Sequence, residues 1–276
     1  SSVECYQHHL SANEAMLKEN GHYLSGMLHY GDEWYWGLDR LQYLELRLND
    51  LAPLGHFTEV KFRRTRDRFC QHISEEALRS LRNKNKRQTI VMYFSSRSPY
   101  SYLGLIRARD LARHYHCDIE IKPVLPMVMR RMQVPQNKSR YITLDVAREA
   151  IDYGIPFGRI ADPLGKGVEN SYALFEWAKQ EGKGVELLES IARGNWAEGI
   201  RSDTHRGLKR LVERVGLDWK QAKARLNDDS WRISVQDNLA ELYAKGHWGV
   251  PSFSVGDLTV FGQDRLERIE QALAGD

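Results

Sequence analysis

The two ends of the chain repeat each other. Residues 21–48 align without a gap on residues 246–273, at a constant offset of 225 positions, and ten of the aligned pairs are identical. In both copies two short runs of strand-forming residues flank a Gly-Asp turn, and a helical apolar pattern begins near a Gly-x-Asp-Arg-Leu element. This pattern predicts that one ββα unit ends two related domains.

The repeat and the breaks in the hydrophobic pattern predict four parts. The first part, residues 1–48, is a partial domain tail that forms a degraded repeat of residues 226–273. The second, residues 49–88, is a basic linker with a short helix. The core consists of residues 89–126 and 246–276, and a helical insertion occupies residues 127–245. We expect the front of the first domain to be missing, either because the chain is a fragment or because the tail is an appendage. We interpret the basic linker as a solvated connection rather than an RNA-binding arm.

The composition excludes several classes of protein. A chain of 276 residues with 42% hydrophobic residues can bury a real core. A net charge of +3 is too small for a chain built mainly to bind nucleic acid or an anionic membrane, and no apolar run reaches the length of a membrane span. The three cysteines form no CxxC pair, so we predict neither disulfides nor a metal site. We expect a cytoplasmic protein with no nucleic-acid or membrane partner.

The order of elements after residue 88 indicates an α/β fold. Residues 89–94 read as a strand, Ser98 and Pro99 as the start of a helix that runs to Arg113, and residues 118–124 as a second strand. Helical periodicity follows as far as Lys245, and then come two strands around a turn and a last helix. The order βαβ, helices, ββα predicts a thioredoxin-like fold interrupted by an all-helical insertion domain and preceded by a partial repeat of the ββα tail.

The first strand-to-helix turn of a thioredoxin-like fold carries its reactive group, because a helix N-terminus stabilises an anion there. Here the turn reads Ser98-Pro99-Tyr100-Ser101, which has the spacing of the CPYC site of glutaredoxins with each sulfur replaced by oxygen. A dithiol is therefore lost. Glutathione can supply a thiolate instead, with Ser98 donating a hydrogen bond to its sulfur. The alternative is that Ser98 only caps the helix.

Two further segments indicate a peptide-like ligand. Pro251 opens a strand, so we expect a cis bond that leaves the N–H and C=O of Val250 free to pair with an extended peptide; the alternative is an ordinary strand-start proline. Asp264, at the start of the last helix, can accept the ammonium of a γ-glutamyl group, or it can serve only the helix dipole.

Together these segments resemble the 2-hydroxychromene-2-carboxylate isomerases and kappa-class glutathione transferases of the DsbA-like thioredoxin superfamily. The resemblance covers residues 89–276. It is carried by the following segments: Ser98-Pro99-Tyr100-Ser101-Tyr102-Leu103-Gly104, Lys122-Pro123-Val124-Leu125, Lys138 with Tyr141, Gly154-Ile155-Pro156-Phe157, Asn195-Trp196-Ala197-Glu198-Gly199-Ile200, Trp248-Gly249-Val250-Pro251-Ser252-Phe253 and Phe261-Gly262-Gln263-Asp264-Arg265-Leu266.

The resemblance implies roles for single residues. Ser98 is then the catalytic serine facing the glutathione sulfur. The residues implied to bind glutathione are Lys138, at the glycyl carboxylate, Val250 with Pro251, at the cysteinyl backbone, and Gln263 with Asp264, at the γ-glutamyl end. The candidates on the substrate side are Arg97, Tyr100, Trp196 and Ile200. Three features depart from the family. Ser95 stands where the family has Asp, Arg97 stands where it has an apolar residue, and the asparagine of kappa-class enzymes upstream of the lysine has no clear counterpart in residues 129–133.

We therefore predict a glutathione-dependent isomerase or transferase that acts on an aromatic or electrophilic small molecule. The alternative is a non-catalytic DsbA-like module that binds a peptide or partner at Val250. Thiol–disulfide exchange is disfavoured by Ser98 and Ser101, although a DsbA-family oxidoreductase label would fit the fold. The sequence leaves open whether the chain forms a homodimer.

Overall fold

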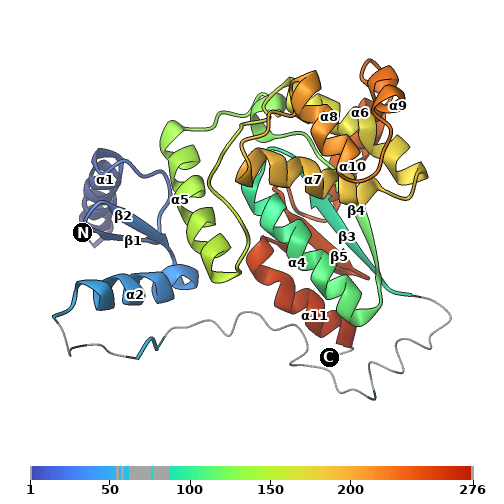
Figure 1. Cartoon of the computed structure of the whole chain (residues 1–276). Helices are drawn as coiled ribbons and strands as arrows, with labels where there is room; N and C mark the ends of the chain where they lie inside the picture. The colour runs from blue at the N-terminus through green and yellow to red at the C-terminus, as the bar shows by residue number, and fades with distance from the viewer. Residues whose placement is uncertain (1, 54–55, 57–58, 62–75, 77–86, 275–276) are drawn as a thin grey trace. The chain divides into compact units, whose positions relative to one another are not determined.

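The computed structural model describes residues 2–53, 56, 59–61, 76 and 87–274. The chain divides into two compact units: unit 1 comprises residues 1–66 and 133–149, and unit 2 comprises residues 67–132 and 150–276 (Figure 1). The basic stretch of the predicted linker, and the short helix expected in it, lie almost wholly outside the described residues. None of the described helices has the length and apolar character needed to span a membrane.

A mixed four-stranded sheet forms the centre of unit 2. Its strands are β3 (Thr89–Phe94), β4 (Asp118–Pro123), β5 (Ser252–Val255) and β6 (Leu258–Phe261), in the spatial order β4-β3-β5-β6. β3 runs parallel to β4, with Phe94 opposite Pro123, and antiparallel to β5, with Tyr93 opposite Ser252. β5 and β6 form an antiparallel hairpin. The predicted βαβ and ββα segments are thus neighbours in one sheet.

Helices cover both faces of this sheet. On one face, α4 (Pro99–Tyr115) and α11 (Leu266–Ala274) lie side by side (Figure 1). A Cβ atom added at Gly104 of α4 would lie 2.9 Å from Phe253, so α4 packs close to the sheet here. On the other face, Tyr93 packs against Leu242 of α10 (Trp231–Ala244). Because side chains alternate along a strand, β3 is buried on both faces.

The other helices of unit 2 pack around a core of their own. They are α6 (Lys166–Gln180), α7 (Gly184–Ala197), α8 (His205–Glu213) and α9 (Trp219–Arg225). The short helix η2 (Met127–Arg130) packs in another cluster, with Met129 against Tyr172 and Trp231. Leu187, Ile191 and Leu211 are fully buried in the cluster between α6, α7 and α8. This helical part interrupts the sheet between β4 and β5, and the predicted mixed α/β, thioredoxin-like order of elements is confirmed.

Unit 1 is a hairpin with three helices. α1 (Ser2–Glu19) precedes β1 (Met27–Tyr30) and β2 (Glu33–Trp36), which pair antiparallel; η1 (Leu38–Arg40) and α2 (Leu41–Leu51) follow. The third helix is α5 (Gln136–Asp152), of which all but the last turn belongs to this unit. Residues 133–149 lie inside the segment 127–245 that the sequence predicts as one insertion, yet they pack with residues 1–66.

The internal repeat is visible in the backbone of the two units. Adding 225 to the bounds of β1, β2 and η1 yields the bounds of β5, β6 and η3 (Gln263–Arg265). Gly37 N–H donates to Gly26 O at 3.0 Å, and at the matching place Gly262 N–H donates to Pro251 O at 2.9 Å. The identical glycines adopt positive φ angles in both copies, 58° at Gly31 and 56° at Gly256. Residues that carry a Cβ atom rarely adopt a backbone conformation with positive φ, which explains why glycine stands at both turns.

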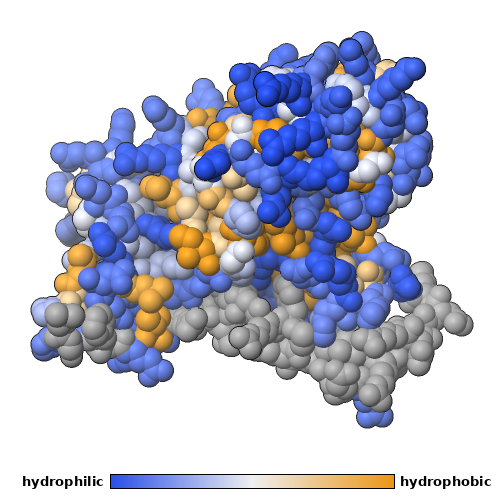
Figure 2. All heavy atoms as spheres, viewed as in Figure 1, coloured by the Kyte–Doolittle hydropathy of each residue, from blue (hydrophilic) through white to orange (hydrophobic). Residues whose placement is uncertain are grey.

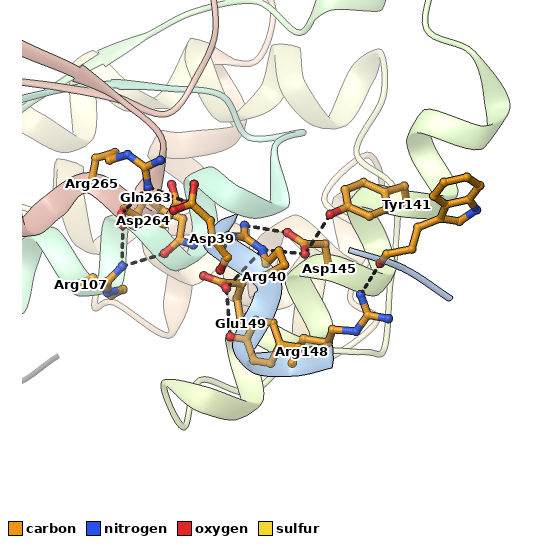
Figure 3. A network of polar contacts seen from close by, with 12 residues as sticks. Asp39, Arg40, Arg107, Tyr141, Asp145, Arg148, Glu149, Gln263, Asp264 and Arg265 are labelled. Atoms are coloured by element: carbon orange, nitrogen blue, oxygen red, sulfur yellow. Dashed lines mark hydrogen bonds and ion pairs between the residues drawn. The ribbon is translucent and has the colours of Figure 1, made fainter. Parts of the chain in front are cut away.

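A buried polar cluster joins α5 to the rest of unit 1 (Figure 3). Arg40 Nε and Nη2 each donate to a carboxylate oxygen of Asp145 at 2.8 Å, and Arg40 Nε also lies 3.5 Å from Glu149 Oε1. Tyr43 donates to the same Glu149 oxygen at 2.9 Å. Arg40 is 3% exposed and both carboxylates are fully buried. These partners explain how two acidic side chains of α5 are tolerated in an interior.

The helix α2 exposes several large apolar side chains. Leu46, Leu48 and Leu51 are 47%, 43% and 52% exposed, and orange hydrophobic surface is visible over this helix in Figure 2. In unit 2, Leu273 occupies the position that corresponds to Leu48 and is only 1% exposed. The ββα segment of unit 1 therefore has a less complete core than its counterpart in unit 2.

Candidate active site at the carboxyl end of β3

The sheet topology brings the predicted segments of unit 2 to one edge. Because β3 and β4 are parallel, their carboxyl ends lie together, and Val124 N–H donates to Phe94 O at 2.8 Å. Because β5 is antiparallel to β3, its amino end lies at the same edge, as does the carboxyl end of β6. The loops 95–98, 250–251 and 262–264 therefore meet there.

Ser98 is the N-cap of α4. Its Oγ accepts a hydrogen bond from Ser101 N–H at 3.1 Å, and Pro99 occupies the first helical position. The cap uses the oxygen as an acceptor, and the Ser98 O–H donates to none of the described residues. Ser98 is partly exposed, whereas Ser101 is buried and its Oγ accepts from Ser95 N–H at 3.3 Å. Ser98 thus combines a helix N-terminus with a hydroxyl proton that has no acceptor among the described residues.

The peptide bond between Val250 and Pro251 is cis, as predicted. The side chain of Val250 packs against the cluster of Tyr93, Val124 and Leu242. No hydrogen bond joins the N–H or C=O of Val250 to another of the described residues. This backbone therefore has unused donor and acceptor groups at the start of β5.

Gln263 is oriented by a buried contact within unit 2 (Figure 3). It is 1% exposed, and its side-chain oxygen accepts from Arg107 Nη1 at 2.8 Å. Arg107 in turn lies 3.9 Å from the centre of the Tyr153 ring. The Asp264 side chain is 16% exposed, with a carboxylate oxygen 3.5 Å from Arg265 Nη1. The structure therefore places Gln263 in the interior and Asp264 nearer the surface.

Arg97, directly before Ser98, is held by an ion pair with two contacts. Its Nε donates to Asp162 Oδ1 and its Nη2 to Asp162 Oδ2, both at 2.8 Å. The Arg97 side chain is 23% exposed. Leu164 N–H also donates to Asp162 at 3.0 Å, which fixes the carboxylate. A planar guanidinium held in this way has one defined orientation.

The other candidates on the substrate side differ in position. The Trp196 indole N–H donates to Ser96 O at 3.2 Å, and its ring is nearly parallel to that of Phe157 at 6.4 Å. Tyr100 lies on the first turn of α4 and is partly buried. Ile200 is 8% exposed and belongs to the core cluster of the helical part. Trp196 thus contacts the loop before Ser98, whereas Ile200 packs in the helical core.

Lys138 lies on the first turn of α5, in unit 1. Its Nζ is 5.7 Å from the centre of the Tyr23 ring. Burial lowers the pKa of the Lys138 ammonium below its usual value of 10.5. Its role toward glutathione stays a prediction.

Tyr172 of α6 was not singled out from the sequence, yet it joins two loops of the site. Its hydroxyl donates to Val124 O at 2.8 Å and accepts from Ser96 N–H at 3.3 Å. Burial raises the pKa of Tyr172 to about 12, so it stays protonated. Its partners lie 48 and 76 positions away, and a local sequence pattern carries no signal for such contacts.

The edge also contains buried polar atoms without partners. Ser95 Oγ and Ser96 Oγ, each in a residue that is 1% exposed, have no hydrogen-bond partner among the described residues, and both hydroxyls face Tyr172. The amide group of the fully buried Asn195, next to Trp196, has none either. Within the described ranges, no group of three or more His, Cys, Asp or Glu is arranged to hold a metal ion.

Comparisons with known proteins agree with this architecture. The chain is 27% identical over 200 residues to a 2-hydroxychromene-2-carboxylate isomerase of Sphingobium xenophagum, covering 67% of this chain and 98% of the relative. It is 24% identical over 192 residues to the enzyme of the same name from Pseudomonas putida, covering 66% of this chain and 92% of that one.

Solved structures show the same fold. A 2-hydroxychromene-2-carboxylate isomerase matches with a TM-score of 0.59 and 23% identity, over 68% of this chain and 95% of the other. A probable DsbA oxidoreductase from Streptomyces coelicolor matches with a TM-score of 0.53 and 19% identity, over 68% and 89%.

The sequence relatives support an enzyme, and the structural neighbours support a thioredoxin-like fold. Residues 89–274, which include the whole sheet of unit 2, match the family described as the DsbA-like thioredoxin domain. The chain belongs to the DsbA-like thioredoxin domain family.

Proposed function

We propose that this chain is a glutathione-dependent isomerase that acts on an anionic aromatic small molecule. The observation that carries the proposal is the position of Ser98, whose Oγ caps α4 while its O–H proton is not used by the described residues. Such a group donates a hydrogen bond to an anion placed at the helix N-terminus. The curated relatives bear the name of an isomerase, which favours this class of reaction.

The residues at the carboxyl end of β3 fit glutathione. Val250 offers a backbone N–H and C=O with no described partner, which suits the extended cysteinyl part of a tripeptide. Ser98 faces the place of the sulfur, and Asp264 offers a carboxylate for the γ-glutamyl ammonium. When bound, glutathione supplies a sulfur nucleophile that adds to an electrophilic carbon and later leaves.

Ser98 and the N-terminus of α4 have one task, which is to stabilise negative charge on that sulfur. The positive end of the α4 dipole and the Ser98 hydroxyl both favour a thiolate over a thiol. Neither Ser98 nor Ser101 carries a sulfur atom of its own, so this turn holds a thiolate and does not exchange a disulfide.

Arg97 and Trp196 suit the second substrate. The curated relatives are named for a substrate that carries a carboxylate, and Arg97, the residue before Ser98, has a guanidinium whose orientation is fixed by Asp162. The partly exposed ring of Phe157, which lies nearly parallel to the buried ring of Trp196, offers an apolar surface that suits an aromatic ring. We infer that Arg97 orients the carboxylate while Ser98 holds the sulfur at the reacting carbon.

Calorimetric titration of reduced glutathione tests this proposal. Titrations between pH 6 and 9, in two buffers with different ionisation enthalpies, should show proton release below the thiol pKa in the wild type. Ser98→Ala should abolish that proton release and weaken binding. Thr204→Ala is the matched control, because Thr204 caps α8 in the same manner away from the sheet edge. No binding to the wild type at millimolar glutathione contradicts the proposal.

A second candidate function is a non-catalytic module that binds an extended peptide at Val250. The unused backbone groups of Val250 favour it, and it needs no thiolate. In this case a peptide without cysteine should bind as well as glutathione does, and Ser98→Ala should leave the affinity unchanged.

A further inference from the structure

Unit 1 contains a sheet edge that is open among the described residues. β1 pairs with β2 alone. Tyr30 and Glu33 close a two-residue turn, and Gly37 N–H donates to Gly26 O at the other end of the hairpin. In such a ladder the hydrogen-bonded pairs alternate, so Tyr30 and Leu28 direct their backbone groups toward β2. The N–H and C=O of Met27 and His29 therefore point outward.

The two edges of this hairpin differ in their hydrogen bonds to other described residues. On the β2 side, Arg148 of α5 donates to Trp34 O at 2.9 Å and its guanidinium also lies 4.4 Å from the centre of the Tyr35 ring. On the β1 side, no described residue donates to or accepts from the backbone of Met27 or His29. An uncovered row of backbone groups is a template for strand pairing.

The repeat indicates which kind of strand fits this edge. Ser252 and Ser254 of β5 correspond to Met27 and His29, and in unit 2 they lie opposite Tyr93 and Val91 of the antiparallel β3. The hairpin registers of the two copies are the same after the shift of 225 positions. The β1 edge thus has the geometry that accepts a strand of the β3 type.

The side chains of unit 1 lack the cover that their counterparts have. Tyr30 is 42% exposed, whereas Val255 at the matching position is 7% exposed. Leu48 is 43% exposed, whereas the identical Leu273 is 1% exposed. In unit 2 the part of the fold that contributes this cover includes β3 and α4. The same segment would bury the apolar surface of α2 in unit 1.

We propose that unit 1 is a docking surface for a second β-α-β segment of the kind formed by residues 89–123, whose first strand pairs antiparallel with β1 and whose helix covers α2. Residues 89–123 of this chain are already engaged in the sheet of unit 2, so the occupant is a different segment of the same type. An apolar strand and an amphipathic helix are the chemistry that recognises this surface.

Hydrogen exchange resolved at single residues tests the strand pairing. The probe is a synthetic peptide with the β3 sequence Gln88–Ser95, flanked by lysines for solubility, added to the full chain. The amides of Met27 and His29 should exchange freely without peptide and about tenfold more slowly with it. His29→Pro, which removes the outward N–H together with the ring that stacks on Trp34, should abolish protection of Met27. His29→Ala is the matched control, because it loses the same ring but keeps the N–H.

A second variant tests the helix surface. With a longer probe of the sequence 88–115, which adds the helix of α4, Leu48→Gln should weaken peptide-induced protection and leave the unfolding midpoint of the chain unchanged, whereas Leu273→Gln at the matching buried position should lower the midpoint. Three results overturn the proposal. These are slow exchange of Met27 and His29 in the chain alone, slow exchange that depends on chain concentration and so indicates a second copy, and protection that His29→Pro leaves intact.

Discussion

Arg97 and Asp162 form an ion pair with two parallel contacts of 2.8 Å, directly before the serine that caps α4. The pair joins residues 65 positions apart and restrains the guanidinium next to the candidate site. A positive charge with a fixed direction suits recognition of a planar anion, which is the role proposed for Arg97.

If the proposed function holds, Arg97→Gln should raise the KM for an anionic aromatic substrate by about tenfold or more, with a smaller change in kcat, because a charge-assisted hydrogen bond to the substrate is lost; the compound for which the relatives are named serves as the test substrate. Asp162→Asn should raise KM less, since Arg97 keeps its charge but loses its restraint. Steady-state kinetics at saturating glutathione measure both. The control is Arg201→Gln, which removes an exposed Arg–Asp pair with Asp203. An unchanged KM in Arg97→Gln would show that Arg97 does not meet the substrate.

Arg40 offers a test of the buried cluster in unit 1. Arg40→Leu leaves Asp145 and Glu149 buried without their cation, and breaking a buried pair in this way costs about 3–5 kcal/mol. The loss in unfolding free energy is measured by urea titration, with hydrogen exchange of the amides in β1 and α5 as the readout. Arg47→Leu is the control, because its ion pair with Glu33 is 42% and 35% exposed and should be worth less than about 1 kcal/mol. Equal losses in the two variants would refute a special role for the buried pair.

Local signals in the sequence predicted much of this fold. Gly31, Gly256, Gly37 and Gly262 stand at turns with positive φ, and for that reason they survive in both copies of the repeat. Ser98 and Pro99 predicted the start of α4 because an N-cap is a local device, and the strand at 89–94 has the bounds read from its apolar run.

Local sequence signals did not predict contacts between residues far apart in the chain. The contact of Gln263 with glutathione, implied by the resemblance, stays a prediction. Its side chain accepts a hydrogen bond from Arg107, 156 positions away, and no local signal predicts this partner. The packing of residues 133–149 with unit 1 depends on Asp145 and Glu149 finding Arg40, which a helical period does not reveal. Periodicity reports which face of a helix is buried, and it does not report what covers that face.

The buried His22 predicts a pH dependence of unit 1. Its Nδ1 accepts from Leu24 N–H at 3.1 Å, and burial lowers its pKa below the ordinary value of 6.5. Above that value both the folded and unfolded states are neutral at this residue. As the pH falls through it, the unfolded chain takes up the proton first, so stability is lost on acidification.

Hydrogen exchange of β1 and β2 between pH 7.5 and 5, corrected for the intrinsic rate, should thus show falling protection as the pH decreases. His22→Phe should flatten this dependence, and His8→Gln, at an exposed position of α1, should leave it as in the wild type. Protection that rises on acidification would mean that the folded state, and not the unfolded chain, binds the proton more tightly at His22.

Cys117 should be a slow thiol. It is partly buried after the end of α4, and burial raises its pKa to about 11, so roughly one in a thousand side chains is a thiolate at pH 8. Iodoacetamide should therefore label the exposed Cys5 much faster than Cys117, as measured by peptide mapping over time. Labelling of Cys117 at the rate of Cys5 would show that the thiol is activated.

The substitution Gly104→Ala has two effects of opposite sign on the stability of unit 2. Inside a helix, Gly→Ala stabilises by about 1 kcal/mol through backbone entropy. A Cβ at this position would, however, lie 2.9 Å from the ring of Phe253 and 3.3 Å from the Cβ of Gln263, both of which are buried. Because a packed core resists such an insertion, we expect Gly104→Ala to destabilise unit 2 by about 1–3 kcal/mol.

Urea unfolding of the wild type and Gly104→Ala measures this change. Gly104→Ala should cost less in a Phe253→Leu background than in the wild type, because the smaller side chain removes the contact of 2.9 Å. A single variant that is more stable than the wild type would mean that α4 can move away from the sheet, which the close packing of Gly104 argues against.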